Sequence, residues 1–451
     1  MAARPERSAR FRYGDVAVDE AAGVVQCHYL LDDQAFVETV LLGPGRTWTA
    51  AAHEAARLVH LLAGVSYFKA GAPRVIDLGN NVLRPGEEQF LRAFYIHGLG
   101  EFSYTNGISL DALEFTGGHE PDAREPGARG GASLDTSRVL IPFGGGIDSL
   151  VTVDSLARQF DDISLFIANR ANDRFQAIER SAAATSLPVL RAEREIDKRI
   201  LNPGSPDSYF NGHVPITGIL SAIAVLVAIL DGRGMVVMSN EWSASRGNII
   251  FDGRPINHQF SKSEAFETSF RSVLAAAFGP ELEYFSFLRP FSELWVAERF
   301  SRLPQFHAVV HSCNRAFSLD AEKRLETWCG RCDKCCFIDL ILAPFMERVQ
   351  LDTLFHGNEP LSDPSLLPSF RDLLGIGEGT KPFECVGDVD ECRTALTLAS
   401  EREDRSGNLL IQRLLADLGD SSLAAREDAG RLLSVLGPHH IPDAIAGAAL
   451  V

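Results

Sequence analysis

Residues 139–151 read Val139-Leu140-Ile141-Pro142-Phe143-Gly144-Gly145-Gly146-Ile147-Asp148-Ser149-Leu150-Val151. The apolar, β-branched start is typical of a buried strand, and the pattern over 150–160 is typical of a helix. Glycine lets the backbone approach an anion closely, and a helix N-terminus presents free N–H groups and the positive end of its dipole. The stretch therefore predicts a phosphate-binding turn between a strand and a helix. A glycine-rich turn without a ligand is the alternative.

Two common phosphate-binding motifs do not fit this turn. It lacks the Gly-Lys-Ser/Thr ending of a Walker loop, and its glycine spacing differs from that of a dinucleotide fingerprint. The run resembles instead the Ser-Gly-Gly-x-Asp-Ser signature of the PP-loop ATP pyrophosphatases, which cut ATP between the α- and β-phosphates. Gly144 replaces the usual leading serine and offers no hydroxyl at that position. The residues that this resemblance implies for ATP binding are Gly144, Gly145, Gly146, Asp148 and Ser149.

From residue 138 onward, strand-like and helix-like runs alternate, as a doubly wound parallel sheet requires. We expect residues 138–300 to form a parallel, doubly wound PP-loop domain similar to the adenine nucleotide α-hydrolases. Three strand-like runs over 11–42 and a helix over 50–63 predict an N-terminal α+β domain, residues 1–115, which we expect to contact substrate. The remaining expected segments are a Gly/Pro-rich linker (116–137), a cysteine-rich segment (301–345) and a helical C-terminal region (346–451).

The composition limits the class of protein and its partners. A length of 451 residues suits two or three domains, and a hydrophobic content of 45% is ordinary for a soluble protein. No apolar core follows the first residues, and the longest apolar stretch, 215–230, is too short for a confident membrane span. We therefore expect a cytoplasmic protein without a membrane partner. The sequence does not indicate an oligomeric state.

The net charge of −17 bears on the substrate. Many enzymes with a loop of this kind modify transfer RNA, and a nucleic-acid backbone demands a basic surface. The chain has no marked tract of Lys and Arg. We expect a small-molecule substrate and no nucleic-acid partner.

Polar residues follow two of the expected strands. Asn169 and Arg170 follow one strand, and Asn240 and Glu241 follow another. Ligands of open α/β sheets bind outside the carboxyl ends of the strands, so these residues should share one crevice with Asp148. We expect Asn169 and Arg170 to contribute to ATP binding. Glu241 and Asp148 are placed to hold Mg²⁺ or to polarise a substrate.

Four cysteines, Cys313, Cys329, Cys332 and Cys335, have a spacing typical of metal sites. Tetrahedral zinc takes four soft ligands, and a Cys-x2-Cys turn supplies two of them. The run resembles the zinc knuckle of the 7-cyano-7-deazaguanine synthases, another PP-loop group. A structural Zn²⁺ is one interpretation. Reduced cysteines in a core, catalytic thiols and an iron–sulfur cluster are the alternatives.

His213 stands immediately before the apolar helix, in Asn211-Gly212-His213-Val214-Pro215. A histidine at this place can contact a phosphate or take up a proton at neutral pH. The alternative is a structural role, which is the commoner one for a lone histidine.

Several segments together resemble one family, the ATP-dependent UDP-N-acetyl-α-D-muramoyl-L-alanyl-L-glutamate epimerases of bacterial peptidoglycan synthesis. The segments, spread over nearly the whole chain, are the strand-rich opening, the glycine loop, 211–215, 239–241, 328–335 and Lys381-Pro382-Phe383-Glu384-Cys385.

The resemblance implies that ATP converts the terminal L-glutamyl carboxylate to an acyl adenylate, which makes the α-proton acidic. Removal of that proton and its return to the other face give D-glutamate, and the by-products are AMP and pyrophosphate. For this chemistry we expect Mg²⁺, catalysis by His213, Glu241 and Asp148, and substrate contacts by Asn240, Arg246 and Arg289. Another PP-loop adenylating enzyme, a ligase forming amides or nitriles or a nucleobase modifier, is the alternative.

Overall fold

A computed structural model describes residues 5–119, 134–201, 208–247, 249–318, 320–377 and 386–449. Its main sheet has ten strands, in the order β12 (Glu283–Ser286), β9 (Arg233–Met238), β6 (Asp135–Pro142), β7 (Asp162–Asn169), β8 (Val189–Glu195), β3 (Gln34–Leu41), β2 (Val24–Leu31), β1 (Arg10–Asp19), β4 (Val75–Asp77) and β5 (Glu114–Thr116). A separate hairpin consists of β10 (Ile249–Phe251) and β11 (Arg254–Ile256).

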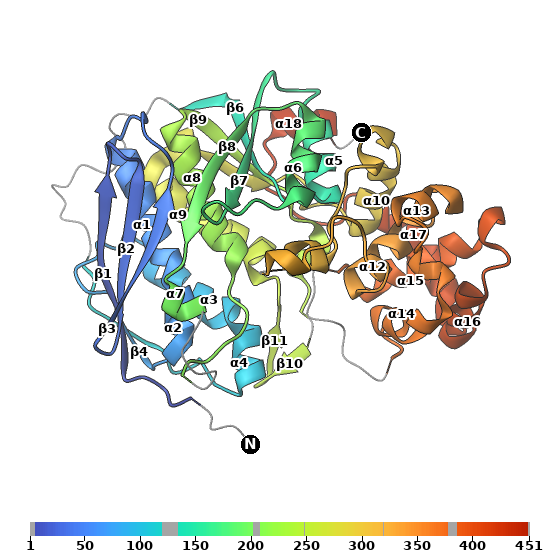
Figure 1. Cartoon of the computed structure of the whole chain (residues 1–451), viewed down its shortest axis with the longest axis horizontal. Helices are drawn as coiled ribbons and strands as arrows, with labels where there is room; N and C mark the ends of the chain where they lie inside the picture. Colours follow the sequence, from blue (N-terminus) through green and yellow to red (C-terminus); the bar gives the residue numbers. More distant parts are fainter. Residues whose placement is uncertain are drawn as a thin grey trace.

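The α-helices in these ranges are α1 (Ala50–Ala63), α2 (Val65–Gly71), α3 (Glu87–Gly98), α4 (Gly100–Asn106), α5 (Ile147–Leu156), α6 (Gln176–Thr185), α7 (Lys198–Leu201), α8 (Ile216–Leu230), α9 (Glu264–Phe278), α10 (Glu293–Ser301), α11 (Pro304–His307), α12 (Asp333–Leu342), α13 (Arg348–Leu354), α14 (Leu367–Leu373), α15 (Val389–Ser400), α16 (Leu409–Leu418), α17 (Ser421–Leu432) and α18 (Asp443–Ala449). Two 3₁₀ turns matter below, η1 (Trp242–Ser245) and η2 (Phe260–Lys262). Figure 1 shows β1–β3 on one side of the molecule and α13–α17 on the opposite side.

The parallel part of the sheet reverses its strand order once. From β6 the sheet continues through β7 and β8 on one side, and through β9 and β12 on the other. All four of these pairings are parallel. The reversal between β6 and β9 is a topological switch point, where sheets of this kind bind their ligands. The predicted α/β fold with a mostly parallel sheet is confirmed.

The N-terminal strands extend this sheet. The three strand-like runs expected over 11–42 are present as β1, β2 and β3, paired antiparallel. β3 then pairs antiparallel with β8, with Val40 opposite Arg194. The segments expected as an N-terminal domain and a PP-loop domain therefore share one sheet, and two segments of the expected linker belong to strands, β5 and the start of β6.

Two hydrophobic cores lie on opposite faces of the sheet. Leu140 of β6 faces the core that contains α1, α8 and α9, whereas its neighbours Val139 and Ile141 face the core that contains α5, α10 and α12. Successive residues of a strand point to opposite faces, so a strand covered by helices on both faces needs a continuous apolar run. This requirement explains the apolar start of residues 139–151. The glycine turn, which directly follows this strand, is therefore held between two packed layers of helices.

The C-terminal region is helical, as expected, over its described residues. α15 begins with a capping box, in which the Asp388 N–H donates to Glu391 Oε2 at 2.6 Å. α12 begins at Asp333, because the cysteine turn leads directly into it, and it ends at Leu342, just before Pro344. Proline cannot continue a helix from within. Residues 120–133 of the expected linker and the segment Lys381–Cys385 lie outside the described residues.

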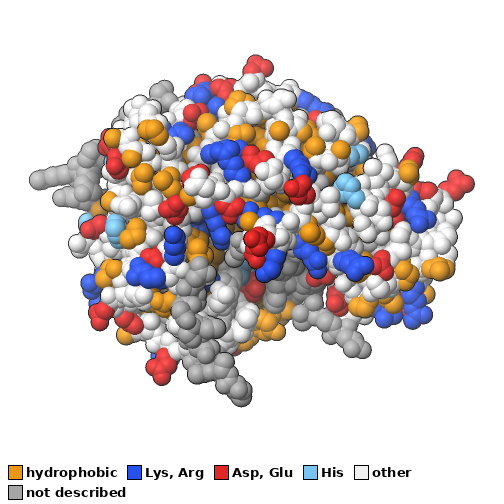
Figure 2. Space-filling view, viewed as in Figure 1, with side chains coloured by type: hydrophobic (Ala, Val, Ile, Leu, Met, Phe, Trp, Pro, Cys, Tyr) orange, Lys and Arg blue, Asp and Glu red, His pale blue; other side chains and the backbone are white. Residues whose placement is uncertain are grey.

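The surface carries mixed charges. On the face shown in Figure 2, Lys and Arg side chains are interspersed with Asp and Glu. Within the described ranges, the helices lack the combination of length and apolar character that crossing a bilayer would need.

Candidate active site

The glycine turn lies at the switch point, between the end of β6 and the start of α5. Gly145 has φ +77°, and a Cβ on it would lie 3.1 Å from Ile178 Cα, so this position requires glycine. A Cβ on Gly144 would meet nothing within 4 Å, so the serine of the PP-loop signature would fit there. The Gly144 N–H donates to Ser149 Oγ at 3.3 Å, which closes the turn onto the first turn of α5.

A cavity of about 400 Å³ opens beside this turn, and we call it the loop cavity. It is bounded by Gly144, Asp148 and Ser149 from the turn and by Ser239 and Asn240 after β9. These residues stand at the carboxyl ends of the two strands that flank the switch point. The structure therefore brings together the glycine turn and the Asn240 segment, as the sequence predicted.

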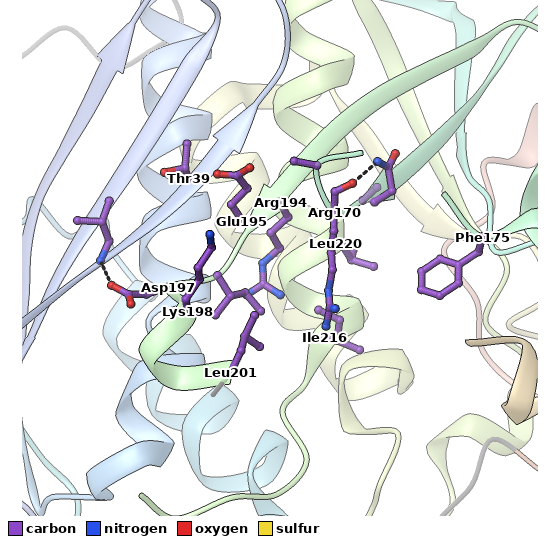
Figure 3. Close-up of a pocket in the computed structure, with 15 residues that line it drawn as sticks. Thr39, Arg170, Phe175, Arg194, Glu195, Asp197, Lys198, Leu201, Ile216 and Leu220 are labelled. Carbon is purple, nitrogen blue, oxygen red and sulfur yellow. Dashed lines mark hydrogen bonds between the residues drawn. The ribbon is translucent and has the colours of Figure 1, made fainter. Parts of the chain in front are cut away.

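A second cavity of about 600 Å³ adjoins the first, because Ala168 and Leu220 line both. Figure 3 shows Arg170, Phe175, Arg194 and Lys198 around it, and Asn169 also lines it. Asn169 and Arg170, expected at the ATP, thus line the second cavity and not the loop cavity. The combination of cationic, aromatic and apolar side chains suits a ligand with both a charged and an apolar part.

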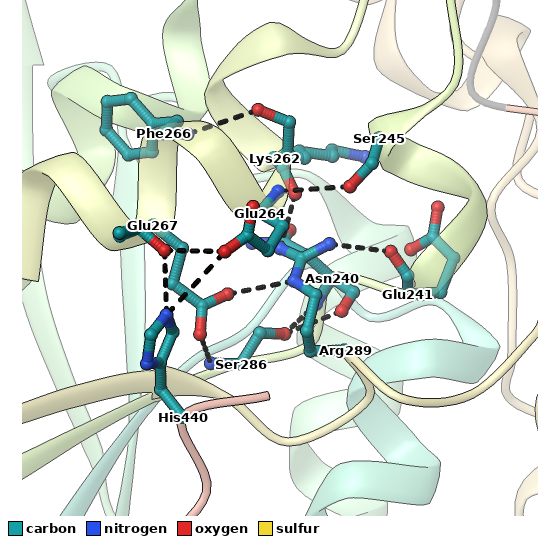
Figure 4. A network of polar contacts seen from close by, with 12 residues as sticks. Asn240, Glu241, Ser245, Lys262, Glu264, Phe266, Glu267, Ser286, Arg289 and His440 are labelled. Atoms are coloured by element: carbon teal, nitrogen blue, oxygen red, sulfur yellow. Dashed lines mark hydrogen bonds and ion pairs between the residues drawn. The ribbon is translucent and has the colours of Figure 1, made fainter. Parts of the chain in front are cut away.

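A buried network holds the loop after β9. Arg289 is 1% exposed, and its guanidinium donates to Glu267 Oε2 at 3.0 Å, to the Glu241 carbonyl at 2.8 Å and to the Lys262 carbonyl at 2.5 Å. Figure 4 shows Arg289 at the centre of these contacts. The Asn240 N–H donates to Ser286 Oγ at 2.6 Å. These contacts leave Arg289 with a positioning role, in place of the expected contact with substrate.

Arg246 lies away from this network, on the surface. Its guanidinium is 3.5 Å from Asp388 Oδ2 and lies over the Trp242 ring at 4.5 Å. The side chain is 49% exposed. Its expected contact with substrate stays a prediction.

A group of carboxylates lies behind the glycine turn. Burial raises the pKa of Glu293, and the charges of Asp148 and then Glu241 raise it further. Burial also raises the pKa of Glu391 to about 7. This side chain accepts a hydrogen bond from the Glu293 N–H at 3.0 Å. Carboxylate oxygens are the ligands that Mg²⁺ prefers, so Asp148 and Glu241 fit that cation. Glu293 and Glu391 were not predicted, because their distance along the chain from the turn hides the association.

The four cysteines expected at a metal converge. Their sulfur atoms lie within 4.8 Å of one another, and the closest pairs are 3.5 Å, 3.6 Å and 3.8 Å apart. A tetrahedral zinc with bonds of about 2.3 Å places its sulfur ligands about 3.8 Å apart. The N–H groups of Arg331 and Cys332 donate to Cys329 Sγ, as they would to a thiolate. The donor set therefore fits Zn²⁺.

This cysteine centre (Cys313, Cys329, Cys332, Cys335) is joined to the loop cavity. Ser312, Asn314, Phe317 and Lys334 all line that cavity, and each lies within four residues of one of the cysteines. A Cβ on Gly146 would lie 3.7 Å from Ser312 Cβ, so the two segments are in contact. A metal at the cysteines would thus hold one wall of the loop cavity in place.

His213 lies in a different group from Glu241. Its ring centroid is 4.3 Å from that of His258, and its Nδ1 is 3.9 Å from Glu101 Oε2. The same carboxylate oxygen accepts a hydrogen bond from His258 Nδ1. We call Glu101, His213 and His258 the histidine–glutamate cluster. The sequence did not point to Glu101 and His258, because the three members of the cluster come from three separate segments with no common motif.

Comparison with known proteins gives matches over most of the chain. The model of the MurL N-terminal domain matches residues 2–287, and that of the MurL C-terminal domain matches residues 309–429. Three curated relatives carry the name UDP-N-acetyl-alpha-D-muramoyl-L-alanyl-L-glutamate epimerase. The relative from Xanthomonas oryzae pv. oryzae is 35% identical over 96% of this chain and 95% of its own. Those from Micromonospora sp. and Salinispora tropica are 37% and 38% identical, over 97% and 87% of this chain and 97% and 85% of their own.

Proposed function

The chain belongs to the MurL family, and from that premise we propose that it is an ATP-dependent epimerase. Its substrate in this proposal is UDP-N-acetyl-α-D-muramoyl-L-alanyl-L-glutamate, whose terminal L-glutamate it converts to D-glutamate for peptidoglycan precursor synthesis. The observation that carries the proposal is the Gly-Gly-Gly-Ile-Asp-Ser turn beside a cavity at the switch point of a parallel sheet. A turn of this kind is suited to the phosphates of ATP.

Adenylation explains why an epimerase would consume ATP. A carboxylate is already negative, so it strongly resists a second negative charge at its α-carbon. When its oxygen attacks the α-phosphorus of ATP, pyrophosphate leaves and the carboxylate becomes the acyl group of an acyl adenylate, which no longer carries a negative charge on its carbonyl. The carbonyl can then accept the electron pair of the broken α C–H bond. Water finally cleaves the adenylate and releases AMP.

The residues around the loop cavity have distinct tasks in this proposal. The N–H groups at the start of α5 face the phosphates, and Ser149 and Asn240 offer polar contacts at the cavity wall. Asp148 and Glu241 would hold Mg²⁺, which neutralises phosphate charge when bound. Arg170 and Lys198, in the adjoining cavity, suit the diphosphate of the nucleotide sugar. Zn²⁺ at the cysteine centre has a structural task.

The test is an incubation of the purified protein with ATP, Mg²⁺ and the L-glutamyl nucleotide peptide in D₂O. We expect AMP and pyrophosphate, together with a D-glutamyl product that carries deuterium at its α-carbon. Omitting ATP should abolish the deuterium exchange. AMP without α-deuterium would point to another adenylating enzyme. If neither AMP nor the deuterated product forms, the proposal is contradicted altogether.

A further inference from the structure

The histidine–glutamate cluster gathers three side chains that can each bind a metal ion. One ring nitrogen of His213, one of His258 and a carboxylate oxygen of Glu101 lie within 4.8 Å of one another. None of the three residues lines the loop cavity or the second cavity. Two imidazoles and a carboxylate are a donor set that Zn²⁺ and its first-row neighbours accept, with water in the remaining position.

The spacing of these donors is close to what such an ion needs. A tetrahedral zinc with bonds of about 2.0–2.2 Å places its nitrogen and oxygen ligands about 3.3–3.6 Å apart. Glu101 Oε2 is 3.9 Å from His213 Nδ1, and it is in hydrogen-bond contact with His258 Nδ1. A metal ion would take the place of the proton in that contact and part the two atoms by about 1 Å. A histidine that binds a metal through one nitrogen carries its proton on the other, where it can donate to a neighbour.

The segments that carry the donors are packed against one another. Glu101 belongs to the first turn of α4. A Cβ on Gly212, the residue before His213, would lie 3.0 Å from the ring of Phe102, which is also in α4. A Cβ on Gly100 would lie 3.3 Å from Ile256, two residues before His258. Both histidine segments therefore rest on α4, and such packing limits the rearrangement that metal binding requires.

Burial and charge decide which class of ion suits the cluster. The three side chains are 13–22% exposed, so bulk water has limited access to them. The charges of Lys69 and Lys262 act on His213 and oppose a cation there. With one carboxylate against these two ammonium groups, the site lacks the oxygen ligands that Mg²⁺ and Ca²⁺ need. Nitrogen ligands must supply most of the affinity, which selects a transition-metal ion.

We propose that Glu101, His213 and His258 bind a divalent transition-metal ion, in a site separate from the cysteine centre. The ion joins α4 to the two segments that lead into α8 and η2. Ile216 and Thr217, at the start of α8, line the second cavity and the loop cavity, and Lys262 of η2 lines the loop cavity. The site therefore has a structural task, which is to hold segments that continue into the walls of both cavities. The inference goes beyond the proposed function and does not depend on it.

The first test is a titration of untagged protein with Zn²⁺ after the cysteine centre has been loaded with zinc. We expect calorimetry and elemental analysis to find a second zinc ion per chain. Loss of an outer-shell partner costs about 10–100-fold in metal affinity, so His213→Gln and His258→Gln should each lose at least about 100-fold at this second site. His97→Gln is the matched control, because His97 packs on Phe260 outside the cluster. Cys332→Ser should lose only the zinc of the cysteine centre.

A second measurement uses wild-type protein alone, so it does not depend on whether the variants fold. Co²⁺ bound to thiolates absorbs strongly by charge transfer from sulfur, whereas Co²⁺ bound to imidazoles and a carboxylate gives only weak visible bands. We expect metal-free protein titrated with Co²⁺ to show both signals, in two separate phases. The sulfur signal alone, or a second Zn²⁺ that both histidine variants bind as tightly as wild type, would overturn the proposal. Neither measurement uses ATP, so this inference and the proposed function can fail separately.

Discussion

Arg194 and Glu38 form a bidentate ion pair across the seam between β8 and β3. Arg194 Nε lies 2.7 Å from Glu38 Oε1, and its Nη2 lies 2.9 Å from Oε2 and 3.1 Å from Ser66 Oγ. The two side chains are 8% and 0% exposed. The pair thus marks the place where antiparallel strands join the parallel sheet. Because Arg194 also lines the second cavity, the seam is part of the candidate site.

Removing one partner of this pair should cost more than removing both. Glu38→Ala leaves a buried guanidinium without its counter-charge, and we expect the free energy of unfolding to fall by about 3–5 kcal/mol. The double variant Glu38→Leu/Arg194→Leu should lose less, because no buried charge is left unpaired. Urea denaturation of the wild type and these two variants measures both values. A double variant that is less stable than Glu38→Ala would contradict this account.

The glycine turn predicts a contrast between two adjacent positions. Gly145→Ala forces an L-residue into φ +77° and against Ile178, so we expect a loss of about 1–3 kcal/mol in stability and weaker ATP binding. Gly144→Ala has open space around its new methyl group and should change stability by less than about 0.5 kcal/mol. Thermal unfolding and calorimetric titration with ATP give the two readouts. Equal losses at both positions would show that backbone conformation is not the reason for the glycines.

Much of the fold was predictable because its elements have strong local patterns. The helix expected over 50–63 matches α1 residue for residue, since it has a clear apolar face and a capping residue at its start. The joining of β3 to β8 was not predictable, because strand pairing depends on contacts between residues about 150 positions apart. The hairpin β10–β11 was missed for another reason. Its strands have three residues each, too few to show a period.

The candidate site was predictable where one rule of topology applies. Asp148, Ser149 and Asn240 line the loop cavity because they follow the carboxyl ends of strands, which meet at one edge of the sheet. Arg289 also follows a strand, but it points into the protein, where Glu267 neutralises it. Sequence alone cannot tell a buried, paired arginine from one that faces a cavity. The association of Glu101 and His258 with His213 depends on how three distant segments pack together, so the sequence did not predict it.

The cysteine centre predicts that metal loss affects both stability and ATP binding. Cys332→Ser should release zinc and lower the unfolding temperature, because metal-binding free energy contributes to folding. It should also weaken ATP binding, since the cysteines hold Ser312 and Lys334 at the wall of the loop cavity. Cys336→Ala is the control, because this buried thiol lies outside the set. Elemental analysis that finds no zinc in wild-type protein prepared with ample metal would refute the assignment.

His60 makes the N-terminal part of the protein sensitive to acid. Burial lowers its pKa to about 4, whereas an unfolded histidine titrates near about 6.5. The unfolded chain therefore binds more protons between these values, so stability is lost as the pH falls from about 6.5 towards 4, by about 3 kcal/mol in all. His60→Gln keeps a donor for the His28 carbonyl without titrating, and it should flatten this part of the stability profile. His53→Gln, at an exposed position of the same helix, should leave the profile unchanged.

Asp148 offers the most direct test of the glycine turn as an ATP site. It lines the loop cavity in the first turn of α5, and its charge contributes to the raised pKa of the buried Glu293. A neutral side chain there can no longer hold Mg²⁺, so Asp148→Asn should lose AMP formation by about 10²–10³-fold. The same change removes repulsion from Glu293 and should leave the folded protein at least as stable. Asp154→Asn is the matched control, because Asp154 lies on the same helix and pairs with exposed Arg158. AMP formation at the wild-type rate in Asp148→Asn would remove the carboxylate from the reaction, whereas equal losses in both variants would point to damage to α5.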